Sequence, residues 1–263
     1  MSLIHRVTRR PLADFVDFMW LADSYVQPHA AEWLLPTGNM GLVLSLDDRG
    51  PASDLLSGAY TRTFVLDTSR PLSLIGVCFK PGGGFPFFAG PAGELQDLSI
   101  PLDSLWGRKA GILREQLLEV RTAPARFLIL ESFLLGQIRR GPQRHPAVGY
   151  AIKALQNSER PASVACVTEF TGLSARRFIE VFRREVGMTP KVFSRLSRFR
   201  AVVSALELTT AVNWAATALE CGYFDQAHFI HEFRHFAGMS PSAYVRQRTA
   251  SPNHVRVPAP TSR

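Results

Sequence analysis

The C-terminal half of the chain contains one pattern twice, and this repeat restricts the possible folds more than any other feature. Residues 182–193 align with residues 233–244: Phe, Arg, Gly, Met and Pro are identical at an offset of 51 residues. Upstream, Gly172 and Gly222 match at an offset of 50. Two copies at this spacing predict that one supersecondary unit occurs twice within the C-terminal half.

Each copy has the pattern of a short helix, a tight turn and a second helix. In the first copy Gly172 suits the positive φ of a helix end, and Ser174 is placed to cap a helix that runs to about Val186. Gly222 and Asp225 occupy the equivalent positions in the second copy. A helix–turn–helix of this kind presents its second helix outward, where it can enter a DNA major groove.

The two copies are separated by apolar residues at helical spacing. The stripe consists of Val192, Phe193, Leu196, Phe199, Val203 and Leu206. This spacing predicts a single long helix that bridges the units and fixes their separation. A rigid bridge would place both second helices on one face of B-DNA, about 34 Å or one helical turn apart.

The charge of the chain is distributed unevenly between its halves. Residues 1–140 hold 14 basic and 14 acidic side chains, whereas residues 141–263 hold 16 basic and 8 acidic ones. The whole net charge of +8 therefore belongs to the repeat-containing half. Such a concentration favours a polyanionic partner, because Lys and Arg release counterions from phosphates. A basic surface that only keeps the protein in solution is the alternative.

Residues 1–90 have the pattern of a β-rich segment. We expect strands at 41–46, 63–66 and 74–79, because each apolar run is bounded by turn-forming residues, and one early helix near 12–21. Residues 108–120 and 123–138 change to helical spacing, with Ile112, Leu113, Leu117 and Leu118 on the apolar side of the first. The predicted fold class is therefore α+β for the first half, with a helical pair, followed by an all-α domain of two helix–turn–helix units.

Composition predicts a domain boundary and excludes several classes of protein. Residues 141–146 read as a linker between domains 1–140 (β-rich to about 90, helical over 91–140) and 147–247, and the Pro-rich tail 248–263 is expected to be disordered. The sequence lacks an apolar run of the ~18–20 residues that a bilayer span needs, and it lacks the pattern of a secretory signal. Three cysteines without C-x-x-C spacing suit a cytoplasmic protein rather than a disulfide scaffold or zinc finger.

The run 222–234, together with the later segment Gly238-Met239-Ser240-Pro241-Ser242-Ala243-Tyr244, resembles the signature of AraC-type transcriptional regulators. The likeness covers roughly residues 146–246. It implies a bacterial-type cytoplasmic regulator that binds double-stranded DNA. Residues 30–135 resemble more loosely the N-terminal region of a subset of these proteins, through 34–39, 80–84 and 101–107. That likeness implies a cupin-like domain for sensing or dimerisation. The partners implied are a small-molecule effector, a second copy of the chain and RNA polymerase.

The resemblance also implies roles for individual side chains. By position, the base-reading residues are Arg176, Ile179 and Glu180 in the first unit and Gln226, Ala227 and His231 in the second. His231 stands where the family usually carries Arg. The phosphate-contact candidates are Ser174, Arg177, Arg183, Arg184, Asp225, His228 and Arg234. Arg176 is placed to read guanine, with phosphate contact as the alternative. Glu180 is placed to accept from cytosine, or to pair with Arg176, Arg183 or Arg184.

Other chemistries receive little support from the residues. Helical spacing puts His228, His231, Glu232 and His235 on one polar side of the second helix, but ligands from one straight helix rarely converge on a tetrahedral ion. The segment 29–32 reads as a surface loop rather than a cupin metal site. Gly82-Gly83-Gly84 is not followed by the Lys-Ser/Thr of a P-loop. The sequence therefore predicts no catalytic residues, metal or cofactor, and a chain that is not an enzyme.

Two alternative functions remain open at this point. In the first, the N-terminal half is a small-molecule-binding or cupin-type enzymatic domain that is merely tethered to DNA by the C-terminal half. In the second, the C-terminal half is a basic module for acidic polymers or RNA. RNA modules usually expose stacking aromatics on strands, whereas the aromatics here lie on the predicted core sides of helices.

Overall fold

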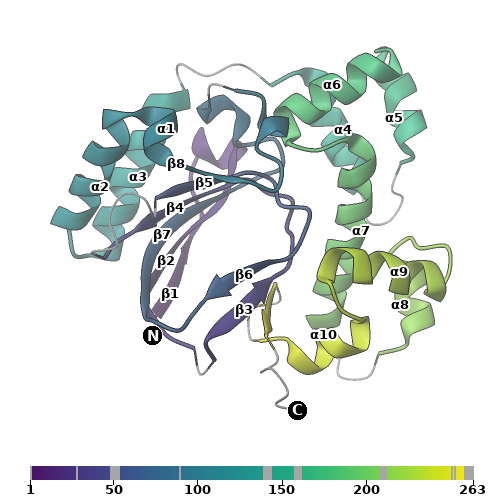
Figure 1. Ribbon diagram of the computed structural model, residues 1–263. Helices are drawn as coiled ribbons and strands as arrows, with labels where there is room; N and C mark the ends of the chain where they lie inside the picture. Colours follow the sequence, from purple (N-terminus) through teal and green to yellow (C-terminus); the bar gives the residue numbers. More distant parts are fainter. Residues whose placement is uncertain are drawn as a thin grey trace.

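The computed structural model describes residues 2–27, 29–47, 54–88, 90–138, 144–156, 162–207, 212–249, 251 and 253–257. Figure 1 shows a β-rich N-terminal half beside a helical C-terminal half. The larger, antiparallel sheet has the order β1-β2-β7-β4-β5-β8. Its strands are β1 (Ser2–Arg6), β2 (Val16–Tyr25), β7 (Leu72–Phe79), β4 (Gly41–Ser45), β5 (Leu55–Ser57) and β8 (Ser99–Pro101).

A smaller antiparallel sheet, ordered β6-β3-β9, lies between the large sheet and the C-terminal helices (Figure 1). It consists of β6 (Phe64–Asp67), β3 (Ala31–Leu34) and β9 (His254–Arg256). The strands predicted over 41–46, 63–66 and 74–79 correspond to β4, β6 and β7. The β-rich domain thus forms from two sheets, and its last strand comes from the far end of the chain.

The helix predicted near residues 12–21 is wrong. Only a 3₁₀ turn, η1 (Leu12–Asp14), forms there, and β2 begins at Val16. Met19 and Leu21, two residues apart, are buried, and they pair with Val77 and Ile75 of β7. This alternation is the period of a strand, and pairing with the central strand β7 outweighs the local helical spacing.

Three helices follow β8 and lie at the end of the large sheet away from the C-terminal half (Figure 1). They are α1 (Leu102–Trp106), α2 (Arg108–Glu119) and α3 (Ala123–Ile138), so the predicted helical pair is confirmed. Leu113 and Leu117 are buried, but Ile112 and Leu118 are 51% and 42% exposed, contrary to prediction. The segment 91–140 is also not wholly helical, since it contains β8, which pairs with β5.

The C-terminal half contains the helices α4 (Pro146–Gln156), α5 (Val164–Thr171), α6 (Ala175–Val186), α7 (Pro190–Glu207), α8 (Trp214–Glu220), α9 (Gln226–Ala237) and α10 (Pro241–Gln247). The long bridging helix predicted between the repeats is α7, in which Phe193, Leu196 and Phe199 are buried. None of the helices in the ranges given above is both long and apolar enough to cross a membrane. The predicted fold class is confirmed.

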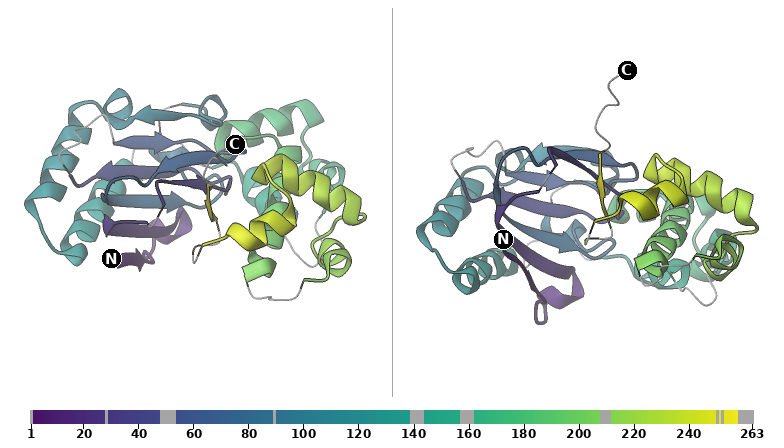
Figure 2. Two further views of the ribbon diagram at one scale, coloured as in Figure 1. Left: turned by 60° about the horizontal axis from the view of Figure 1, so that its bottom comes forward. Right: turned by 90° about the horizontal axis from the view of Figure 1, so that it is seen from below.

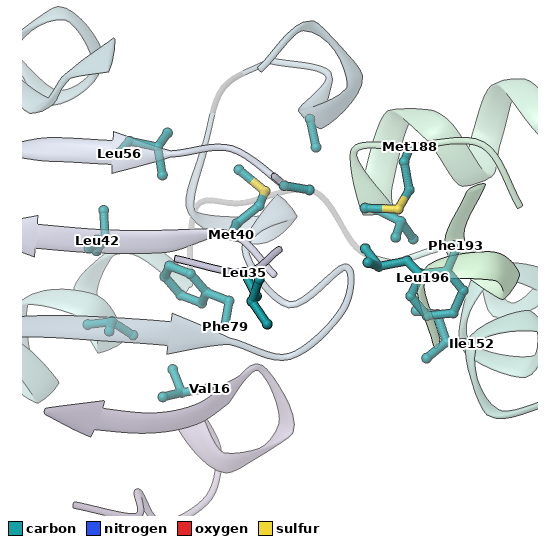
Figure 3. Close-up of a cluster of buried hydrophobic side chains, with 14 of the residues drawn as sticks. Val16, Leu35, Met40, Leu42, Leu56, Phe79, Ile152, Met188, Phe193 and Leu196 are labelled. Carbon is teal, nitrogen blue, oxygen red and sulfur yellow. The ribbon is translucent and has the colours of Figure 1, made fainter. Parts of the chain in front are cut away.

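The two halves share one hydrophobic core. Figure 3 shows Leu35 and Met40 of the N-terminal half facing Met188 and Leu196 of the C-terminal half. At Gly38, which has a φ of 69°, an added Cβ would lie 2.5 Å from Leu196 Cδ2. Because no side chain fits between this loop and α7, the glycine allows the halves to approach closely.

The predicted linker lies only partly within the described residues, since 141–143 fall outside them. The remaining residues do not form a free connection. The guanidinium of Arg144 lies over the ring of Phe15 at 5.8 Å, and the backbone N–H of His145 donates to the Glu185 carboxylate at 3.0 Å. Pro146 already begins α4. These contacts tie the segment to both halves.

The predicted disorder of the tail 248–263 is wrong for residues 254–256, which form β9. Figure 2 shows this strand among the strands of the N-terminal half. β9 pairs antiparallel with β3 through His254↔Leu34, Val255↔Trp33 and Arg256↔Glu32, and Val255 is fully buried. Residues 258–263 lie outside the described part of the chain. The edge of β3 that does not pair with β6 is the partner of β9, and composition alone does not reveal such a pairing.

A buried carboxylate joins this tail to the N-terminal half. Glu32, fully buried in β3, lies 2.8 Å from Nε2 of His29 and 2.7 Å from Nδ1 of His254. The hydroxyl of Tyr25 donates to it at 3.2 Å. Burial acts to raise the pKa of Glu32, but the hydrogen bonds from His254 and His29 outweigh it, so that the pKa lies below its ordinary value. The expected surface loop at 29–32 is therefore wrong for Glu32.

Candidate nucleic-acid interface

The first helix–turn–helix unit consists of α5, a turn and α6. Ser163 caps α5 by accepting from the backbone N–H of Cys166, and Ser174 caps α6 by accepting from that of Arg177. Gly172 ends α5 in the left-handed conformation, as predicted. The caps satisfy N–H groups that the first helical turns leave without partners. Ser174 thus has a structural role at the position assigned to phosphate contact.

The sides of α6 are separated as the sequence predicted. Phe178, Val181 and Phe182 are buried. The base-reading candidates Arg176, Ile179 and Glu180 are all exposed on the opposite side, Ile179 to 41%. Glu180 forms a surface ion pair at 3.0 Å with Arg177, a partner the sequence reading did not consider. This pair is weak because both side chains are solvated.

The second unit repeats the arrangement with α8, a turn and α9. The side chains of Asn213 and Asp225 cap the two helices by accepting from Ala216 N and His228 N. Gly222 in the turn has a φ of 76°. The base-reading candidates Gln226, Ala227 and His231 are all exposed. The phosphate candidates His228 and Arg234 are exposed as well, whereas Asp225 serves as the cap.

Glu232 was placed with the three histidines on the polar side of α9, and the structure separates it from them. Its side chain is buried and turns toward α7, where Arg195 Nε lies 2.7 Å from Oε2 and Arg195 Nη2 lies 2.8 Å from Oε1. Burial acts to raise the pKa of Glu232, but pairing with Arg195 outweighs it and lowers the pKa. Sequence reasoning missed this pair, because the spacing of α9 alone cannot show a partner 37 residues away.

Two predicted phosphate contacts are engaged within the chain. Arg183 Nη2 lies 3.5 Å from the carbonyl oxygen of Gly93, and the guanidinium of Arg184 lies 5.8 Å from the ring centroid of Phe85. These partners belong to the segment that contains η3 (Phe85–Phe87) and η4 (Ala92–Glu94). A groove of about 630 Å³ is lined by this segment on one side and by Arg176, Ile179 and Glu180 of α6 on the other. The two arginines therefore face the N-terminal half in this state.

The structure brings the predicted site residues together within each unit, while the two units lie at opposite ends of α7 (Figure 1). The base-reading candidates of α6 form one exposed cluster and those of α9 a second. Within the ranges that the structure describes, no three His, Cys, Asp or Glu side chains could jointly hold a metal ion. The arrangement offers two polar helix faces, and the chemistry available there is hydrogen bonding and charge attraction.

Gly222→Val is expected to lower the free energy of unfolding by about 1–3 kcal/mol, because a β-branched residue resists positive φ. Urea denaturation followed by circular dichroism measures the effect. Gly222→Asn is the matched control, since Asn tolerates the left-handed conformation and should cost much less. Equal losses for Val and Asn would contradict the role assigned to the turn.

Comparison with known proteins gives separate matches for the two halves. Residues 7–101 match the model of a domain family of unknown function (DUF6597), and residues 167–247 match that of a helix-turn-helix domain. An uncharacterized HTH-type transcriptional regulator of Haemophilus influenzae is 30% identical over 93 residues, which cover 35% of this chain and 31% of that protein. The chain thus spans about a third of the length of this curated relative.

Solved structures are also similar. A probable AraC family transcriptional regulator from Rhodopseudomonas palustris is 28% identical, with a TM-score of 0.34, over 39% of this chain and 96% of that one. ToxT from Vibrio cholerae is 10% identical, with a TM-score of 0.44, over 93% and 97% of the two chains. The match of residues 167–247 identifies this part of the chain as a helix-turn-helix domain, in agreement with the two joined units described above.

Proposed function

We propose that the chain is a transcriptional regulator that reads duplex DNA with α6 and α9. One observation carries the proposal: two capped helix–turn–helix units, each with an exposed polar side on its second helix, are joined by the continuous helix α7. A bridge of 18 residues at 1.5 Å per residue is about 27 Å long, which suits successive major-groove segments on one face of DNA.

We assign the base-reading roles to exposed residues of α6 and α9. Arg176 has a planar fork suited to the O6 and N7 atoms of guanine, and Gln226 has an amide suited to adenine. The exposed Arg234 lies at the end of α9 and is assigned to phosphate. The net charge of +8, all in residues 141–263, supports binding to a polyanion.

The N-terminal half is assigned a regulatory role within the same proposal. Its segment 85–94 faces the base-reading side of α6 across the groove, so a ligand or a partner of this half can alter the access of α6 to DNA. We propose a small-molecule effector for this domain, residues 1–140. Dimerisation through it, contact with RNA polymerase and a cytoplasmic location are further parts of the proposal that follow from the family resemblance.

Selection from a random pool of duplex DNA with the intact chain tests the proposal. A regulator should enrich one motif and bind it at least ~10³-fold more tightly than random duplex. Arg176→Ala should relax the preference at one position of the motif and cost about 1–3 kcal/mol on the selected site. Arg234→Ala is the matched variant: it should weaken all duplexes alike and reduce the dependence of affinity on salt.

Two outcomes would contradict these assignments. A pool that yields no motif, combined with equal binding to RNA and heparin, would reject the proposed function in favour of a general polyanion-binding module. If a motif is enriched but Arg176→Ala keeps the base preference at every position of it, the proposed function would be supported and the base-reading role of Arg176 would be rejected.

A further inference from the structure

Helix α9, the second helix of the second unit, is held on α7 by two kinds of contact. The first is the contact of aromatic rings: Phe199 of α7 lies 5.1 Å from Phe233 and 5.3 Å from Phe236 of α9, centroid to centroid. Burial of the apolar side of α9 sets which side of the helix faces α7, but it tolerates small rotations of α9 about its axis because apolar contact is not directional. A directional contact is needed to fix the angle at which α9 projects.

The pair of Arg195 and Glu232 has that geometry. Two parallel hydrogen bonds of 2.7 and 2.8 Å join the guanidinium to the carboxylate, and the Phe236 ring lies 5.5 Å from the guanidinium carbon. A planar fork bound to both carboxylate oxygens restricts rotation as well as distance. Glu232 is 5% exposed and the Arg195 side chain 27%, so the carboxylate end of the pair is largely shielded from water.

The pair lies directly behind the base-reading side of α9. His231 precedes Glu232 in the sequence, and consecutive residues on a helix are separated by about 100°. A rotation of α9 that strains the ion pair therefore carries His231 and Ala227 with it. The equivalent position of the first unit, at the offset of 51, is Val181. Because valine cannot form an ion pair, this directional contact is a feature of the second unit.

We propose that Arg195 and Glu232 are positioning residues, which fix the direction of α9 relative to α6 and thereby the spacing between the two DNA segments that the chain accepts. The inference rests on the proposed function. It assigns neither residue a contact with DNA. The spacing requirement of the intact chain is the property that these residues control.

The test measures affinity of the full chain for a set of duplexes built on the selected motif. The set contains the selected duplex, duplexes with one base pair inserted or removed between the segments read by α6 and α9, and duplexes with one of these segments scrambled. For Glu232→Gln we expect affinity to fall about tenfold on the selected duplex and less than about twofold on the duplexes of altered spacing. Discrimination between spacings therefore falls, while binding to single segments is kept.

Arg195→Lys is the second variant, because it keeps the charge but lacks the fork, and it should behave like Glu232→Gln. If Glu232→Gln fails to fold, Arg195→Lys still tests the proposal. Glu131→Gln is the matched control: it breaks another two-bond pair, between Arg6 and Glu131 at 2.9 and 3.1 Å, in the N-terminal half. This control should leave the discrimination between spacings unchanged.

Two results would overturn the inference. One is unchanged discrimination between spacings in Glu232→Gln, whether affinity is kept or falls equally on every duplex, as expected of a purely structural pair. The other is wild-type discrimination in Arg195→Lys. Failure of the proposed function is distinct from these, since the unmodified chain would then show no preference among the duplexes.

Discussion

Leu196→Ala is expected to lower the free energy of unfolding by about 2–5 kcal/mol, the range observed for large-to-small changes in protein cores. Leu196 is 1% exposed and lies against the Gly38 loop of the N-terminal half as well as among the residues of α7 and its neighbours. The cavity left by alanine would therefore open at the boundary between the halves. Urea denaturation followed by tryptophan fluorescence and by circular dichroism measures the loss.

Leu219→Ala is the matched control, because Leu219 is 64% exposed and its removal should change the free energy of unfolding by less than about 0.5 kcal/mol. Since Leu196 contacts both halves, we expect the two signals to change together in one transition. A loss for Leu196→Ala no larger than that of the control, or two separate transitions, would contradict a shared core.

Glu32→Gln is expected to lower the free energy of unfolding by about 1–3 kcal/mol near pH 7, since it replaces a buried carboxylate that is hydrogen bonded to two imidazoles. Folding lowers the pKa of Glu32. Its contribution is therefore present above the ordinary glutamate pKa of about 4.3 and is lost as the pH falls through the folded value. The difference between wild type and variant should shrink below about pH 4.

Denaturation curves of both proteins across this pH range provide the measurement. Glu119→Gln is the control, because Glu119 is exposed on α2 and its replacement should change little at any pH. A difference between wild type and Glu32→Gln that stays constant from pH 7 to pH 3 would contradict the role given to the ionised carboxylate.

The parts of the fold that the sequence predicted correctly depend on local signals. The two helix–turn–helix units, their caps at Ser174 and Asp225 and the stripe along α7 can all be read within about 20 residues of chain. Helix caps, glycine turns and helical spacing act over such short distances. The exposed sides of α6 and α9 followed from the same spacing, except that Glu232 of α9 is buried.

The parts that were missed depend on contacts between distant segments. The sequence predicts a helix over the first part of β2, because the period of this strand is visible only with β7 beside it. β9 lacks a local signal, and it forms only because the edge of β3, more than 200 residues earlier, is open to it. The same holds for the pair of Arg195 and Glu232, and for Arg183 and Arg184, whose partners lie in segment 85–94.

The position of β9 has a consequence for synthesis of the protein. Domains usually begin to fold from the N-terminal end while the ribosome is still adding residues. Here β3 cannot complete its sheet until residues 254–256 have left the ribosome, and Glu32 lacks its His254 partner until then. The β-rich half, although it is translated first, is therefore completed last. A nascent chain stalled after α10 would carry an unpaired strand edge.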